Sequence, residues 1–335
     1  LLPGISLRHV DTARVRTGVL VDDRTEGEVV VLVHGNVSSS IFWQETMLAL
    51  PQGFRAIAPD LRGFGATETA PVDATRGLAD FSDDLIALLD ALGIERAHLV
   101  GWSMGGGVVS RLLLDAPERV SSLTLVAPVS PYGFGGTKGA DGVRTTDDDA
   151  GTGGGGANPE FVAALQAGDR GDESPNSARN VMNGFYVADG FHSPLEDAYV
   201  DSMLTTAVGE DNYPGDLVAS ENWPGFAAGT RGVLNTMAPK HHDVSGIVDL
   251  ATKPPILWVH GAKDAIVADE SLFDLATLGK LGAVPGWPGE DVAPPQPMKV
   301  QTRAVLDRYA ANGGAYREFE LDAGHSPHVE RPAEF

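Results

Sequence analysis

Short, nearly uninterrupted apolar runs recur along the first part of the chain and again near its end. Four stand out, at residues 28–35, 54–60, 97–102 and 122–128, and the rhythm of strands resumes later with residues 254–264 and 316–326. A run without polar alternation is typical of a strand that is buried on both faces of a parallel sheet. The pattern therefore predicts a parallel sheet at the core of the protein.

Helical patterns lie between these runs. Phe81, Leu85, Leu88, Leu89 and Leu92 recur at the spacing of one helix face, which Gly93 ends. Residues 103–116 form a second helical pattern, which ends before a proline because proline cannot continue a helix. Alternating strands and helices predict an α/β protein, with helices packed outside the sheet.

The alternation stops after residue 130 and resumes near residue 251. The intervening stretch is rich in glycine, acid and aromatic residues, so we interpret 131–250 as an inserted, mainly helical cap between two parts of one core, 1–130 and 251–335. We expect the glycine run at 151–156 to be mobile, since it cannot bury a core. We expect aromatic side chains such as Phe185, Tyr186 and Trp223 to form an apolar pocket.

Composition narrows the classes of partner. The chain has 335 residues, a formal charge of −22 and no cysteine. Strong acidity argues against nucleic acid and anionic membranes, and the absence of cysteine excludes disulfides and thiolate metal sites. We expect no metal, cofactor or membrane span and a small-molecule partner. Without a visible signal peptide, the cytoplasm is the expected location. The sequence does not reveal the oligomeric state.

A serine stands between two glycines in "GWSMGG", where a predicted strand meets a predicted helix. Glycines at this spacing let a tight turn lift the central side chain into a site, the arrangement called a nucleophile elbow. A Gly-rich turn with an incidental serine is the competing interpretation. Ser103 is therefore our candidate nucleophile, provided that a base can take its proton.

A candidate acid and base follow in the chain in the order that such sites use. Asp264 lies just beyond the predicted strand "ILWVH", and His325 lies just beyond the predicted strand "REFEL". Ligand sites form at this edge of an open α/β sheet. Taken singly, each residue could be a turn or surface residue, but their joint order favours a Ser103–His325–Asp264 triad. His325 would accept the serine proton, and Asp264 would hold the imidazole.

Two backbone amides are the expected oxyanion donors. The loop after the first buried run begins "HGNVSSS", and its glycine lets the next peptide face the site. We assign the donors to the amides of Asn36 and Met104, the latter directly following the candidate nucleophile. The serines at 38–40 are also suited to cap the next helix.

The segments "HGN", "PDLRGFGATE", "GWSMGG", "HGAKDAIV" and "DAGHSPHVERP" together resemble those of cap-bearing α/β-hydrolases, over essentially the whole chain. The resemblance implies a mostly parallel central sheet with flanking helices and an inserted cap, and it makes 60–65 a structural loop. The "HGN" loop is also similar to that of haloalkane dehalogenases. Those enzymes carry an Asp at the position of Ser103, so the serine favours acyl chemistry.

The function expected from the resemblance and the triad is hydrolysis of an apolar carboxylic ester or lactone through an acyl-serine. Two alternatives remain open from the sequence. One is a C–C bond hydrolase that uses the same triad. The other is a ligand-binding receptor with this fold and little turnover.

Overall fold

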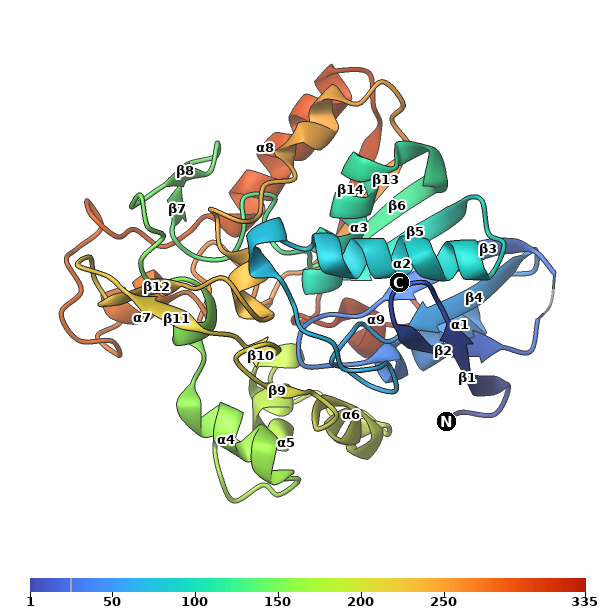
Figure 1. Cartoon of the computed structure of the whole chain (residues 1–335), viewed down its shortest axis with the longest axis horizontal. Helices are drawn as coiled ribbons and strands as arrows, with labels where there is room; N and C mark the ends of the chain where they lie inside the picture. The colour runs from blue at the N-terminus through green and yellow to red at the C-terminus, as the bar shows by residue number, and fades with distance from the viewer. Residues whose placement is uncertain (25) are drawn as a thin grey trace.

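A computed structural model describes residues 1–24 and 26–335. Across these residues the main sheet has eight strands in the order β1-β2-β4-β3-β5-β6-β13-β14 (Figure 1). Their bounds are β1 Ile5–Asp11, β2 Arg16–Asp22, β3 Glu28–Val33, β4 Phe54–Pro59, β5 Ala97–Trp102, β6 Val120–Val126, β13 Ile256–Gly261 and β14 Tyr316–Leu321.

The six strands from β4 to β14 in this order run parallel, as the apolar runs predicted. Strands β1 and β2 were not predicted. They pair antiparallel with each other, and β2 pairs antiparallel with β4. β1 is an edge strand and is largely exposed, so its sequence lacks a long apolar run.

Helices cover the sheet on its two faces. The main ones are α1 Gln44–Ala49, α2 Ala79–Ala91, α3 Met104–Asp115, α7 Leu275–Lys280, α8 Met298–Ala311 and α9 Pro327–Glu330. The predicted stripe on α2 is largely confirmed, since Phe81, Leu85, Leu88 and Leu89 are buried. None of the described helices has both the length and the apolar character of a membrane span.

Residues 131–250 lie in the chain between β6 and β13, which are neighbours in the sheet. Within its described residues this insertion adds no strand to the main sheet and extends to one side of it (Figure 1). Its helical parts include α4 Pro159–Ala167, α5 Ala178–Val181, a π-helix at Met182–Tyr186 and α6 Glu196–Met203. Short strand pairs accompany them: β7 Thr137–Lys138 with β8 Val143–Arg144, β9 Val208–Gly209 with β10 Tyr213–Pro214, and β11 Leu217–Ala219 with β12 Phe226–Ala228.

The glycine run at 151–156 differs from expectation. Residues Gly153–Gly156 form a 3-10 turn packed against β10, β12 and the turn at Leu234–Met237. The amide of Gly154 donates to the side chain of Asn235 at 2.8 Å. A Cβ on Gly153 would lie 2.0 Å from that same side chain, so the glycines permit close packing and do not make a loose linker.

Candidate active site

Ser103 lies in the turn between β5 and α3. Its backbone has φ 57° and ψ −122°, a conformation that L-residues rarely adopt. The flanking glycines allow this turn, because a Cβ on Gly101 would lie 2.3 Å from the carbonyl oxygen of Gly105. A Cβ on Gly105 would lie 2.4 Å from the carbonyl oxygen of His34. The serine therefore stands where the sequence predicted it, at the carboxyl end of a central strand.

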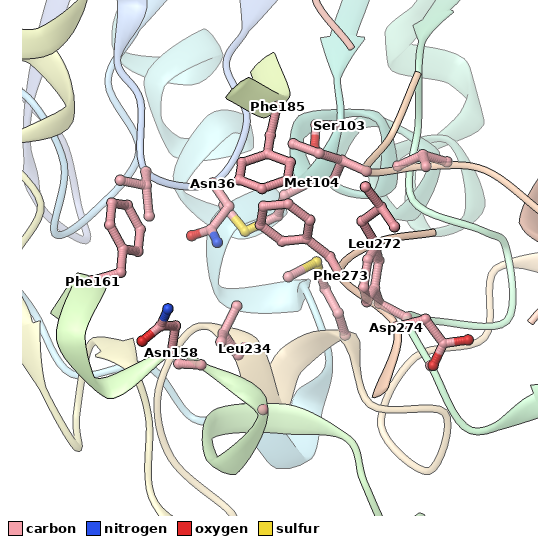
Figure 2. A pocket seen from close by; sticks show the side chains of 18 of the residues that line it. Asn36, Ser103, Met104, Asn158, Phe161, Phe185, Leu234, Leu272, Phe273 and Asp274 are labelled. Atoms are coloured by element: carbon pink, nitrogen blue, oxygen red, sulfur yellow. The ribbon is translucent and has the colours of Figure 1, made fainter. Parts of the chain in front are cut away.

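Ser103 and His325 line the same cavity, which has a volume of about 450 Å³. Figure 2 shows Ser103 at this cavity together with Asn36 and Met104. Its wall combines the sheet edge with the insertion and is predominantly apolar. Aromatic and aliphatic members include Phe134, Phe161, Phe185, Tyr186, Tyr213, Leu234, Met237, Ile266, Leu272, Phe273 and Leu278. The predicted oxyanion residues, Asn36 and Met104, line the same cavity.

The structure brings Asp264 against His325. The imidazole Nδ1 lies 2.9 Å from one carboxylate oxygen of Asp264 and 3.1 Å from the other. The Asp264 Oδ1 atom also accepts hydrogen bonds from the backbone amides of Ile266 and Val267, at 2.8 and 2.9 Å. This carboxylate, whose side chain is fully buried, therefore holds the Nδ1–H tautomer and leaves Nε2 free to accept a proton.

Asn36 belongs to a turn that the protein core anchors. The carbonyl oxygen of the preceding residue, Gly35, lies 2.8 Å from His34 Nδ1 and accepts from Ser38 Oγ at 2.9 Å. His34 Nε2 accepts from the Leu61 amide, so His34 Nδ1 is the donor. In a trans peptide the carbonyl and the next N–H point in opposite directions, so the contacts of the Gly35 carbonyl restrain the Asn36 N–H from the core side.

Burial lowers the pKa of His34, although the charge of Asp60 acts in the opposite direction. The lowered pKa keeps the imidazole neutral while it holds the Gly35 carbonyl. The other predicted donor, the amide of Met104, begins helix α3. A helix start presents free N–H groups and a positive dipole end, which suits a developing oxyanion. Of the neighbouring serines, Ser39 caps the 3-10 turn Ser40–Trp43, as the sequence suggested.

The cavity wall is poor in charge. Among the described residues that line it, none is a lysine or arginine, and the carboxylate Asp274 is the one acidic side chain. Burial raises the pKa of Asp274, whose carboxylate accepts from the amides of Ala276 and Gln296. Asp274 therefore caps helix α7. Since no lysine or arginine is among the described lining residues, the cavity offers an anionic ligand no such cation to pair with.

Two of the three aromatic residues proposed from the sequence line the cavity, and the third does not. Phe185 and Tyr186 are in the wall. Trp223 lies outside it, against a smaller pocket, and donates its indole N–H to the carbonyl of Pro285. Phe273 was missed by sequence reasoning because it sits in the loop after Asp264, outside the aromatic-rich insertion. Its ring meets Phe185 edge-on with 5.1 Å between centroids.

The adjacent histidines His241 and His242 are candidates for a metal site by residue type, but their surroundings are those of structural residues. The His241 Nε2 atom contacts the carbonyl oxygen of Gly229 at 3.1 Å, and Lys240 Nζ donates to the carbonyl of Ala228. Burial lowers the pKa of His242 to about 4. Residues 1–24 and 26–335 contain no cluster of three or more His, Cys, Asp or Glu side chains that could hold a metal ion.

Residues 28–151 match a family model described as alpha/beta hydrolase fold. The chain is 45% identical over 102 residues to a Variovorax paradoxus protein named as a carbamate hydrolase, covering 30% of this chain and 38% of the relative. It is 32% identical over 124 residues to a carboxylesterase of Bacillus subtilis, covering 37% and 42%. It is 36% identical over 139 residues to a 2-hydroxymuconate semialdehyde hydrolase of a Pseudomonas species, covering 41% and 48%.

These matches span less than half the length of each relative. A solved structure of the Bacillus subtilis carboxylesterase superposes with a TM-score of 0.57 at 18% identity, over 98% of this chain and 88% of that one. Together with the strand order, the comparisons confirm the predicted α/β-hydrolase fold.

Proposed function

We propose that this α/β-hydrolase-fold protein is a serine hydrolase that cleaves uncharged, apolar carboxylic esters or lactones. The observation that carries the proposal is a charge-poor, predominantly apolar cavity that Ser103, His325 and the two candidate oxyanion residues all line. The names of the relatives include a carboxylesterase, which supports the same chemistry.

Acylation begins when Ser103 Oγ attacks the carbonyl carbon of the ester. His325 Nε2 takes the hydroxyl proton, and Asp264 stabilises the imidazolium that forms. The amides of Asn36 and Met104 donate to the carbonyl oxygen as it becomes negative. When the C–O bond breaks, the imidazolium returns the proton to the leaving alcohol, and an acyl-Ser103 ester remains.

Deacylation repeats these steps with water. His325 takes a proton from the water as its oxygen attacks the acyl carbon, and then returns the proton to Ser103 Oγ. The products are a free carboxylic acid and the regenerated serine. For a lactone the alcohol stays attached to the acyl group, and the product is a hydroxy acid.

The charge of the cavity favours neutral acyl groups over anionic ones. A carboxylate moved from water into an apolar cavity needs a cationic or multiple hydrogen-bonding partner. The lining offers no lysine or arginine among its described residues. We therefore rank ester and lactone cleavage above cleavage of muconate-type substrates, which the Pseudomonas relative's name specifies for that protein.

The insertion supplies much of the cavity wall, including Phe161, Phe185, Tyr186 and Leu234. In the proposed function, residues 131–250 act as a cap on the core formed by 1–130 and 251–335. The cap excludes water from the acyl group and sets its preferred size.

The test is a substrate panel assayed with the wild-type protein, Ser103→Ala and Ser110→Ala. Ser110 is the matched control, since it is buried on the same helix α3 and donates to the Gly106 carbonyl at 2.8 Å. We expect turnover of neutral p-nitrophenyl esters by the wild-type and control proteins, and a loss of at least about 10³-fold in Ser103→Ala.

The panel also includes a dienoate substrate whose C–C bond would be cleaved, a carbamate and a lactone. Comparing their turnover with that of the esters distinguishes the reaction types. Faster Ser103-dependent cleavage of the dienoate than of every neutral ester would overturn the ester assignment. Binding of panel members without any turnover would instead favour a receptor.

A further inference from the structure

Tyr186 of the insertion reaches the turn that carries the candidate oxyanion donor. Its hydroxyl donates to the carbonyl oxygen of Asn36 at 2.9 Å and lies 3.3 Å from that of Val37. The side chain is buried, and its ring stands edge-on to Trp102 and His325, with centroids 5.8 and 6.2 Å apart. One cap side chain therefore contacts the oxyanion turn and the surroundings of the base.

The local fold delivers this hydroxyl through a π-helical turn. Met182–Tyr186 continues helix α5 with one extra residue in the turn, as π-helices do. Within this turn Phe185 meets Phe273, while the next residue, Tyr186, lies against Trp102 and His325. π-Helical turns are rare in proteins overall, and those that do occur are frequently found at functional sites.

The turn that Tyr186 contacts is a strained one. Val37 has φ 44°, which is unfavourable for a β-branched residue and persists only where surrounding contacts hold it. Gly35 is anchored from the core by His34 and Ser38. The next two carbonyls, of Asn36 and Val37, face Tyr186. The peptides on either side of Asn36 are therefore held from opposite directions, one by the core and one by the insertion.

We propose that Tyr186 is a positioning residue of the oxyanion hole, whose hydroxyl makes the donor geometry of Asn36 depend on a seated cap. This inference rests on the proposed serine-hydrolase function. With the Tyr186 hydroxyl present, the strained turn keeps the Asn36 N–H aimed beside Ser103. Without it, the Asn36 carbonyl loses its donor and the turn is free to rotate the adjacent peptides. Burial raises the pKa of Tyr186, so the hydroxyl stays a neutral donor throughout the working pH range.

The test compares Tyr186→Phe with Tyr309→Phe. Tyr309, on α8, is a matched control because it is also buried and its hydroxyl also donates to a backbone carbonyl, that of Pro254 at 2.6 Å, while it lies outside the cavity wall. For a neutral p-nitrophenyl ester, we expect Tyr186→Phe to lower kcat by about 10- to 100-fold with KM changed by less than about threefold. Tyr309→Phe should keep kcat within about threefold of the wild type.

A second measurement separates oxyanion binding from general damage. A trifluoromethyl ketone forms a tetrahedral oxyanion on the serine, whereas the corresponding alcohol binds the same cavity without one. Tyr186→Phe should weaken the ketone by the same factor as kcat/KM and leave the alcohol unchanged. Titration with the ketone at saturating concentration counts folded sites, so a partly unfolded sample does not imitate the effect.

The two proposals fail in different ways. Ser103-dependent turnover with unchanged kcat and unchanged ketone affinity in Tyr186→Phe would overturn the positioning role alone. Equal weakening of the ketone and the alcohol would also overturn it, because the tyrosine would then act only in packing. Wild-type turnover that survives Ser103→Ala would overturn the proposed function itself.

Discussion

Trp102 donates its indole N–H to the backbone carbonyl of His325 at 2.8 Å, across 223 positions of the chain. The residue directly before the candidate nucleophile thus fixes the loop that carries the candidate base. Trp102 is fully buried and packs against Phe42, with 5.1 Å between ring centroids. This hydrogen bond therefore ties the loop of the candidate base to the turn of the candidate nucleophile.

Replacing Trp102 with Phe removes the indole N–H and leaves the backbone carbonyl of His325 without this hydrogen-bond donor. A buried acceptor that loses its partner costs about 1–3 kcal/mol, and the smaller ring adds a cavity term. We expect a lower free energy of unfolding in urea and a kcat lowered by about tenfold, since the base loses its support.

Trp258→Phe is the matched control for this change. Trp258 is equally buried, but its indole N–H has no partner within the part of the chain that the structure describes. The control should lose stability without losing kcat. A Trp102→Phe protein with wild-type kcat would contradict the proposed support of His325.

The contacts of Asp264 predict the effect of an asparagine there. Its Oδ1 atom accepts from two backbone amides, so the carbonyl of Asn would occupy that position and its NH₂ would face His325. The imidazole would then have to accept at Nδ1 and carry its proton at Nε2, the wrong tautomer for a base. We expect Asp264→Asn to lower kcat by about 10⁴-fold while the protein stays folded. Steady-state kinetics at several pH values would contradict this if the rate stayed within about tenfold.

Phe273 is expected to contribute to acyl-chain preference. It meets Phe185 across the boundary between core and insertion, and both side chains line the cavity. Each buried methylene of a substrate contributes up to about 0.8 kcal/mol, so longer acyl chains should raise kcat/KM in the wild type. Phe273→Ala should flatten that increase over an acetyl-to-octanoyl series.

Phe319→Ala serves as the control, because Phe319 is about equally exposed, at 43% against 39%, but lies on β14 outside the cavity wall. It should leave the acyl-length series unchanged. An unchanged series in Phe273→Ala as well would show that the aromatic pair does not contact the acyl chain.

His328 is predicted to make stability fall at acid pH. It is buried between Trp43 and Trp102, and neither ring nitrogen has a partner among the described residues. Burial, and secondarily the neighbouring His325, lower the pKa of His328 to about 3. Below pH 6.5 the unfolded chain binds a proton that the folded chain does not, so stability is lost as pH falls from 6.5 toward 3.

At about 1.4 kcal/mol per pH unit, this histidine accounts for about 2 kcal/mol between pH 6.5 and 5. His328→Leu should remove that share of the pH dependence, measured by urea unfolding at pH 7.5 and 5, and keep kcat within about fivefold. An unchanged slope would refute the assignment of acid sensitivity to His328. A complete loss of activity would instead question the choice of His325 as the base.

Sequence reasoning succeeded where residue type and position carry the signal locally. The apolar runs and the rhythm of strands and helices identified the parallel strands, and the glycines around Ser103 identified a turn whose contacts tolerate no other residue. The order of Ser103, Asp264 and His325 identified residues that the fold gathers at one cavity or in direct contact.

Features that depend on distant packing were missed or misjudged. The contact between Tyr186 and Asn36 spans 150 positions and needs a π-helical turn that no spacing rule predicts. The prediction that Trp223 lies in the cavity wall was wrong, because aromatic content does not reveal which way a side chain faces. The packing of the glycine run at 151–156 was not foreseen, because composition alone cannot distinguish a flexible glycine from one required for close packing.

The covalent acyl-Ser103 intermediate provides the most direct test of the proposed serine-hydrolase mechanism. The wild-type protein is mixed with a neutral p-nitrophenyl ester, quenched in acid within the first turnovers, and analysed by intact mass and peptide mapping. We expect an added acyl mass on the peptide that contains Ser103, and no such adduct in Ser103→Ala. Turnover without an adduct at Ser103, or a folded Ser103→Ala protein that keeps about a tenth of the wild-type rate, would contradict it.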